Sequence, residues 1–182
     1  MLQLTIPSIE KFDENKNEFI NTKEQHLQLE HSLVSMSKWE SKWHKPFLGS
    51  INKTDEETID YIRCMTLTQN VDPSVYYSIT QSVEKQITDY INDSMTATWF
   101  VEESGTKKGS NKEVITSELI YYWMIALNIP VEFQKWHLNR LLTLVKVCNI
   151  KNAPPKKMSR RETMSRNKAL NEQRRRAMNS RG

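Results

Sequence analysis

The stretch ITSELIYYWMIALNIPVEFQKWHLNRLLTLVKVC, residues 115–148, holds the densest apolar sequence of the chain and predicts the core of the fold. Nearly every residue in 119–127 is apolar or aromatic, which is typical of a helix buried at the centre of a domain. Thr116 or Ser117 suits the N-cap of this helix, and Pro130 suits the first position of a second helix with apolar residues at helical spacing. We therefore expect two helices packed as a hairpin core.

The residues that precede this core predict further helices. Ser32 is a suitable N-cap for a helix that runs to His44, and Thr54 begins the capping box Thr-Asp-Glu-Glu. Shorter helical segments are expected to start near Pro73 and Ser82. The chain has only 4 Gly and 6 Pro among 182 residues, which favours long helices over turn-rich β structure. The expected fold class is mainly α, with a compact helical body over residues 32–151.

Two regions predict extended backbone instead. In residues 1–31, apolar and polar side chains alternate at period two on both sides of a polar break at 13–16. This pattern indicates a small antiparallel β-ribbon, which must pack on the helices or pair with another chain. Residues 95–101, MTATWFV, predict a short strand or an extended segment that leads into a polar loop over 102–112.

The basic charge of the chain is concentrated at its C-terminal end. Residues 156–182 contain ten of the 26 Lys and Arg but two of the 22 Asp and Glu, a net charge of +8. The other 155 residues, with 16 basic and 20 acidic side chains, carry −4. Pro154 and Pro155 stiffen the backbone between the two parts. We expect residues 152–182 to form a linker and a basic arm that becomes helical when bound.

The motifs of an enzyme, a cofactor site or a metal site do not occur in this sequence. The four histidines are scattered, and His26 and His31 have poor spacing for a shared metal. Cys64 and Cys148 lie in apolar helical patterns that indicate buried thiols, and the pair Glu102-Glu103 is typical of a solvated loop. No apolar run is long enough for a membrane span. We expect a non-enzymatic protein without catalytic residues, cofactor or metal.

Trp39 and Trp43 lie one helical turn apart and are the first candidates for a binding surface. Packing into the core is one interpretation, and an exposed aromatic patch for a partner is the other. The string SKWESKWHK has the aromatic and basic alternation of a base-stacking platform, but Glu40 interrupts it. Glu40 and the other polar residues between the tryptophans are expected to face solvent or a polar partner.

The arginines of the basic arm are the second set of candidates. They would neutralise the carboxylates of an acidic protein or the phosphates of a nucleic acid, and a merely solvated charge run is the third interpretation. The arm residues that we expect to contact a partner are Arg160, Arg161, Arg174, Arg175 and Arg176.

Several strings of the chain resemble a family of small proteins encoded in the tail modules of long-tailed double-stranded DNA phages, the tail assembly chaperones. The strings are LQLTIP at 2–7, LQLEHSLVSMSKWESKWHKPF at 27–47, ETIDYIRCMTLTQNVDP at 57–73, MTATWF at 95–100, the opening stretch at 115–148, and IKNAPPKKMSRRETMSRNKALN at 150–171. The resemblance extends over nearly the whole chain.

The resemblance implies an assembly factor that binds the tape measure protein, keeps this long helical polypeptide from aggregating, and helps to recruit tail tube subunits such as the major tail protein. Its expected place is the host cytoplasm, and an oligomer is possible. Two alternatives stay open. The first is a structural component of the head-to-tail or tail region that remains in the virion, and the second is a nucleic-acid-binding protein that acts through the basic arm.

Overall fold

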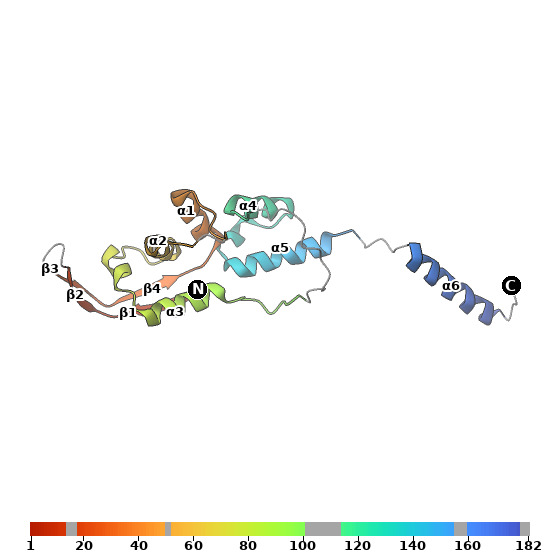
Figure 1. Ribbon diagram of the computed structural model, residues 1–182, viewed down its shortest axis with the longest axis horizontal. Helices are drawn as coiled ribbons and strands as arrows, with labels where there is room; N and C mark the ends of the chain where they lie inside the picture. The colour runs from red at the N-terminus through yellow and green to blue at the C-terminus, as the bar shows by residue number, and fades with distance from the viewer. Residues whose placement is uncertain (14–17, 50–51, 101–113, 155–159, 179–182) are drawn as a thin grey trace. The chain divides into compact units, whose positions relative to one another are not determined.

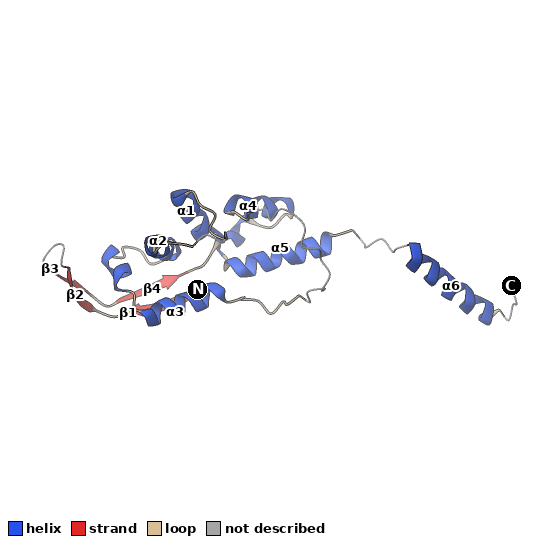
Figure 2. Ribbon diagram, viewed as in Figure 1, coloured by secondary structure: helices blue, strands red, loops and turns tan. Residues whose placement is uncertain are grey.

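The structure is a computed structural model that describes residues 1–13, 18–49, 52–100, 114–154 and 160–178. The chain divides into two compact units, Met1–Asn149 and Ile150–Gly182. Most of the elements are helices (Figures 1 and 2). In chain order the elements are β1 Leu2–Ile6, β2 Ile9–Asp13, β3 Glu18–Thr22, β4 Gln25–Leu29, α1 Leu33–Trp43, α2 Asp55–Met65, the 3₁₀ helix η1 Pro73–Ser78, α3 Gln81–Asn92, α4 Ser117–Ala126, the 3₁₀ helix η2 Val131–Lys135, α5 Leu138–Asn152 and α6 Arg160–Ala177.

The predicted helix starts of α1 and α2 are confirmed by their caps. The Ser32 hydroxyl accepts from the Ser35 amide, and the Thr54 hydroxyl accepts from the Glu57 amide. Both helices form full capping boxes, because the N3 side chain in each case returns a bond to the N-cap amide. α1 ends at His44, whose φ of 52° is the left-handed conformation that closes a helix.

The predicted N-terminal ribbon consists of two antiparallel pairs. β1 pairs with β4 from Leu2 opposite Leu29 to Ile6 opposite Gln25, and β2 pairs with β3. Leu4 and Ile6 turn inward and are buried, while Gln3 and Thr5 face out, so the period-two pattern predicts the correct faces. The ribbon packs on the helices, since β1 contacts α3.

Residues 30–32 connect the ribbon to three helical elements. The Glu30 amide donates to the Met65 carbonyl at the end of α2 over 2.9 Å, and the Leu138 amide at the start of α5 donates to the His31 carbonyl over 2.7 Å. Ser32 caps α1 and forms a bridge with His137. These backbone bonds make the ribbon part of the first unit's core.

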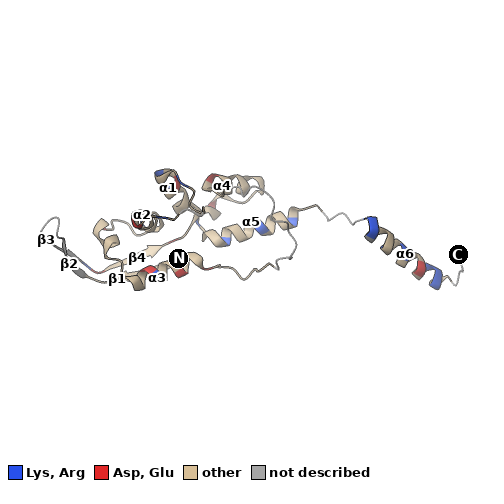
Figure 3. Cartoon of the chain, viewed as in Figure 1, with Lys and Arg blue, Asp and Glu red and all other residues tan. Residues whose placement is uncertain are grey.

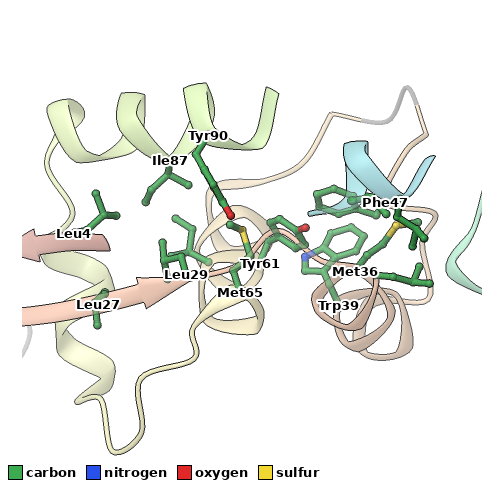
Figure 4. Packing of buried hydrophobic residues seen from close by; sticks show 14 of the residues in the cluster. Leu4, Leu27, Leu29, Met36, Trp39, Phe47, Tyr61, Met65, Ile87 and Tyr90 are labelled. Atoms are coloured by element: carbon green, nitrogen blue, oxygen red, sulfur yellow. The ribbon is translucent and has the colours of Figure 1, made fainter. Parts of the chain in front are cut away.

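Buried side chains from β1, β4, α1, α2, η1, α3, α4 and α5 form one hydrophobic cluster in this unit, part of which is drawn in Figure 4. Leu29, Leu33 and Leu138 are fully buried. Tyr61 of α2 stacks on Phe47 with ring centroids 4.0 Å apart. The core therefore collects residues from both ends of the unit and is not confined to residues 115–148.

The prediction of a hairpin core from residues 115–148 is wrong in two respects. α4 packs chiefly against α1, and only one side of it is buried. The second helix does not start at Pro130, because residues 131–135 form η2 and α5 begins at Leu138. The bridge between Ser32 and His137 explains the delay, since the extended backbone that it needs interrupts the helix.

The predicted short strand at 95–101 does not form over its described residues, 95–100, where Met95 has a left-handed φ of 48° and the chain bends at residue 97. The expected helix near Ser82 begins at Gln81, and Pro73 begins η1 as predicted. The polar loop 102–112 lies outside the described residues.

Acid is expected to destabilise the first unit through His31. This side chain is 2% exposed, and its ring lies 5.0 Å from the ring of His137. Burial, with a smaller contribution from His137, lowers the pKa of His31 to about 3. An unfolded histidine has a pKa of about 6.5, so below that pH the unfolded chain binds the extra proton. The free energy of unfolding should then fall by about 1.4 kcal/mol per pH unit until pH approaches 3.

Urea denaturation at pH 7.5 and pH 5.0 measures this effect, with an expected loss of about 2 kcal/mol from His31. His31→Gln should reduce the difference in the free energy of unfolding between pH 7.5 and pH 5.0. His44→Asn is the matched control, because His44 is exposed and Asn tolerates its left-handed backbone. Equal pH dependence in both variants would contradict the assignment to His31.

Candidate interaction surface

Trp39 is a core residue. It is 1% exposed, and its indole Nε1 donates to the Glu57 carbonyl over 2.8 Å. Its ring meets Phe47 edge to face at a centroid distance of 5.3 Å. Of the two interpretations of the tryptophans, packing is therefore correct for Trp39, and its assignment to a partner surface is corrected.

Trp43 is half-buried beside the same core. Its indole Nε1 donates to Asp60 Oδ2 over 2.9 Å, and Lys42 forms an ion pair with the other oxygen of that carboxylate. Because these bonds hold Trp43 across α1 and α2, its main role in this structure is to join the two helices.

The expectation that Glu40 faces solvent is wrong. The side chain is buried, and its carboxylate accepts from two backbone amides, those of Phe47 and Ser117, each over 2.7 Å. Ser117 is the first residue of α4. Glu40 thus joins the start of α4 to α1 and to the turn that follows α1.

The arm arginines all lie in α6, and their side chains are exposed. Figure 3 shows basic residues at both ends of this helix. Arg176 forms an exposed ion pair with Glu172 one turn earlier, at 2.9 Å. An exposed pair of this kind contributes little to stability, so these arginines are available for contacts outside the chain.

α4 exposes an apolar surface that the sequence pattern assigns to the core. Its buried residues, Ser117, Ile120 and Met124, lie on one side of the helix. On the opposite side Tyr122 is 63% exposed and Ile125 is 73% exposed. We call this outer side, formed by Glu118, Tyr122, Ile125 and Ala126, the α4 face.

Contacts at both ends of α4 hold the α4 face in place. The Thr116 side chain caps the helix, and Glu40 binds the Ser117 amide. At the other end Asn128 turns the chain with a φ of 53°, and the Tyr121 hydroxyl donates to Gln134 of η2 over 2.9 Å. A fixed apolar surface loses little conformational entropy when a partner covers it.

A signal for this surface is present in the sequence. A helix with one solvent side normally carries polar residues there, but α4 is apolar around most of its circumference. Such a helix is buried from all sides, either inside its own domain or partly by another chain. The prediction of a central buried helix covers only the first of these cases.

A groove beside α2 and η1, lined mostly by charged residues, is a second candidate surface. Ile59 and Tyr77 line it together with Asp55, Glu56 and Arg63. The Arg63 guanidinium lies 5.4 Å from the centre of the Tyr77 ring, so a positive charge lies against the aromatic side chain of the groove. The carboxylates and this cation make the groove less suited to an apolar segment than the α4 face.

The histidines and cysteines of the chain can be placed in the structure. Among the described residues there is no group of three or more His, Cys, Asp or Glu that suits a metal ion. His31 and His137 come together in the interior, where neither is accessible, and no sequence pattern indicates this contact. Cys64 and Cys148 are free and half-buried, and burial raises the pKa of the Cys64 thiol.

No helix in the described ranges has the length and apolarity that a membrane crossing requires. The chain matches no protein-family model, no curated protein and no solved structure.

Proposed function

We propose that the protein is a phage tail assembly chaperone that binds the tape measure protein through the α4 face and assists assembly of the tail tube. The observation that carries the proposal is the exposed pair Tyr122 and Ile125 on a helix that is apolar nearly all round. The resemblance of the sequence strings supports the same role. The protein would act in the host cytoplasm without catalysis, with the major tail protein as the second proposed partner.

The α4 face suits an amphipathic helix as the bound segment. Tyr122 and Ile125 are three residues apart and point to the same side, which matches the i, i+3 and i+4 anchors of a partner helix. Glu118 on the face is exposed and acidic. Its carboxylate favours a partner whose apolar stripe has Lys or Arg beside it.

Burial of the α4 face also explains how such a protein would prevent aggregation. A long amphipathic polypeptide exposes apolar stripes until its own assembly is complete, and these stripes associate with one another. Contact with Tyr122 and Ile125 would cover one stripe reversibly. Because the face is small, binding would be weak enough for tube subunits to displace it.

The test is co-expression of the full chain with the tape measure protein encoded beside it. The unchanged chain should keep that protein soluble and co-purify with it. Tyr122→Lys/Ile125→Lys should weaken binding by about thirtyfold, since it removes both anchors and adds positive charge near a basic partner. The helix itself should remain, because Glu118 followed four residues later by a lysine is a favourable i, i+4 pair.

The matched control is Leu67→Lys/Tyr77→Lys, which changes an aliphatic and a tyrosine side chain of similar exposure, 55% and 62%, at the α2 side of the molecule. It should leave binding within about twofold of the original. A loss of binding only in this control variant would place the binding site at the groove beside α2. No co-purification of the unchanged chain would refute the proposed function.

The two alternatives have separate tests. A structural virion component should be found in stoichiometric amount by mass spectrometry of purified virions, whereas a chaperone should be nearly absent from them. A nucleic-acid-binding protein should bind with an affinity that falls steeply with salt and disappears when residues 156–182 are deleted.

A further inference from the structure

A second pocket adjoins the groove beside α2 and η1. Its volume is about 410 Å³, and α2, η1 and α3 each contribute lining residues. It shares Asp55, Ile59 and Tyr77 with the groove, so the two are neighbours on the surface. We call this second cavity the η1 pocket. Its volume lies within the range that ligand sites occupy in proteins.

The η1 pocket has apolar residues from two parts of the chain. Ile62 of α2 and Tyr76 of η1 line it and are buried in the core. Ile59 and Ile79 line it as well and are partly buried against the same core. Tyr77 is 62% exposed and completes the apolar set. These side chains suit the hydrocarbon part of a ligand.

The charged residues that line the η1 pocket are both acidic. Asp55 lies in the first turn of α2 and Glu84 in the first turn of α3, and both are exposed. Neither carboxylate forms an ion pair with another described residue. Lys42 and Arg63 line the adjoining groove but not this pocket. The pocket therefore offers two negative charges that no lining cation neutralises.

Helix stabilisation explains each of these acids separately but not the pocket that they share. An acidic residue in a first helical turn interacts favourably with the helix dipole, so its presence alone does not indicate a ligand. Here two helices contribute one acid each to the same pocket, beside isoleucine and tyrosine side chains. A ligand with a cationic head and a hydrocarbon stem matches both kinds of wall, and Lys and Arg side chains have this composition.

A contact within the chain shows the same kind of recognition. In the adjoining groove the Arg63 guanidinium lies 5.4 Å from the centre of the Tyr77 ring. The η1 pocket offers Tyr77 again, now together with carboxylates. Because Tyr77 and both acids are exposed, a small free amine would stay largely in water, whereas a side chain is held there by the rest of its protein.

We propose that the η1 pocket binds a Lys or Arg side chain of another protein. The hydrocarbon stem lies against Ile59 and Tyr77, and the cationic head lies beside the carboxylates of Asp55 and Glu84. An apolar residue next to the basic one contacts the remaining isoleucines. The η1 pocket shares no residue with the α4 face, so this site does not depend on the proposed function.

The test titrates the full-length, isotope-labelled chain with three peptides at low salt and follows its amide resonances by NMR. The first peptide is acetylated Leu-Arg-Leu amide, and in the other two the Arg is replaced by citrulline or by Glu. Citrulline has nearly the shape of Arg without its charge. The Arg peptide should bind about fivefold more tightly than the citrulline peptide, and the Glu peptide more weakly than either. The shifted resonances should be those of residues that line the η1 pocket.

Two charge-matched variants separate the pocket from net charge. Asp55→Asn/Glu84→Gln should lose about fivefold in affinity for the Arg peptide and keep its affinity for the citrulline peptide within about twofold. Asp89→Asn/Glu132→Gln makes the same change in net charge at exposed carboxylates outside the pocket. It should lose less than about twofold. Circular dichroism would verify that helix content is equal in both variants.

Three results would overturn the proposal. They are equal binding of the Arg and citrulline peptides, equal losses in the two variants, and shifted resonances that lie away from the η1 pocket. Tyr122→Lys/Ile125→Lys should bind the Arg peptide as the unchanged chain does. Failure of this site is therefore distinguishable from failure of the proposed function.

Discussion

Trp39→Ala is expected to lower the free energy of unfolding by about 4 kcal/mol, the largest effect of any single substitution considered for this chain. The indole is 1% exposed and is surrounded by Phe47, Trp43 and the aliphatic part of the core. Its removal leaves a cavity that the capped helices α1 and α2 cannot close, and it deprives the Glu57 carbonyl of the indole donor.

Equilibrium denaturation with urea measures this loss, with the slope of the transition compared between variants. Trp99→Ala is the matched control, because Trp99 is the same residue type and is largely exposed. It should change the free energy of unfolding by less than about 0.5 kcal/mol. A loss below about 1.5 kcal/mol for Trp39→Ala would show that Trp39 is not packed as described.

Glu40→Ala is expected to cost about 3 kcal/mol. The substitution leaves the buried amides of Phe47 and Ser117 without acceptors, and each bond from a neutral donor to a carboxylate is worth about 1.5 kcal/mol or more. It also releases the start of α4, so the α4 face should lose its fixed position. Glu40→Gln keeps one acceptor oxygen and should cost about half as much.

The same urea measurement tests Glu40, with Glu24→Ala as the control for loss of a single negative charge. Glu24 is exposed and has only a distant contact with His26, so its replacement should be nearly neutral. If Glu40→Ala and Glu24→Ala had equal effects, the two amide bonds of Glu40 would contribute nothing measurable.

The parts of the fold that can be predicted from the sequence are those set by local chemistry. Ser32 and Thr54 cap helices because their hydroxyls reach amides only three residues away. The alternation in β1 likewise places Leu4 and Ile6 inward without help from distant residues. Such features follow from backbone geometry, and a single sequence is enough to find them.

The predictions that are wrong depend on contacts between distant residues. Periodicity favours a helix from Pro130, but pairing of His137 with Ser32 holds the preceding residue in an extended conformation. Glu40 has the pattern of a surface residue, yet its second acceptor contact is with Ser117, 77 positions later. Neither contact can be recognised from the residues that adjoin it in the sequence.

The candidate binding surfaces divide in the same way, into those that local sequence predicts and those that depend on distant contacts. Composition identifies α6 and its arginines directly, because charge is a local property. Trp39 and the α4 residues are both recognised by apolar character, which does not reveal on which side of a helix the rest of the chain lies. The structure assigns Trp39 to the interior and Tyr122 and Ile125 to the outside.

The anchoring of α4 by Glu40 has a thermodynamic consequence. A carboxylate inside the core fixes one side of this helix, while its other side still contacts water. Any ligand that covers the outer side binds only the folded chain, so its binding free energy adds to the stability of the fold. The stability of the folded chain would then rise with the concentration of the proposed partner.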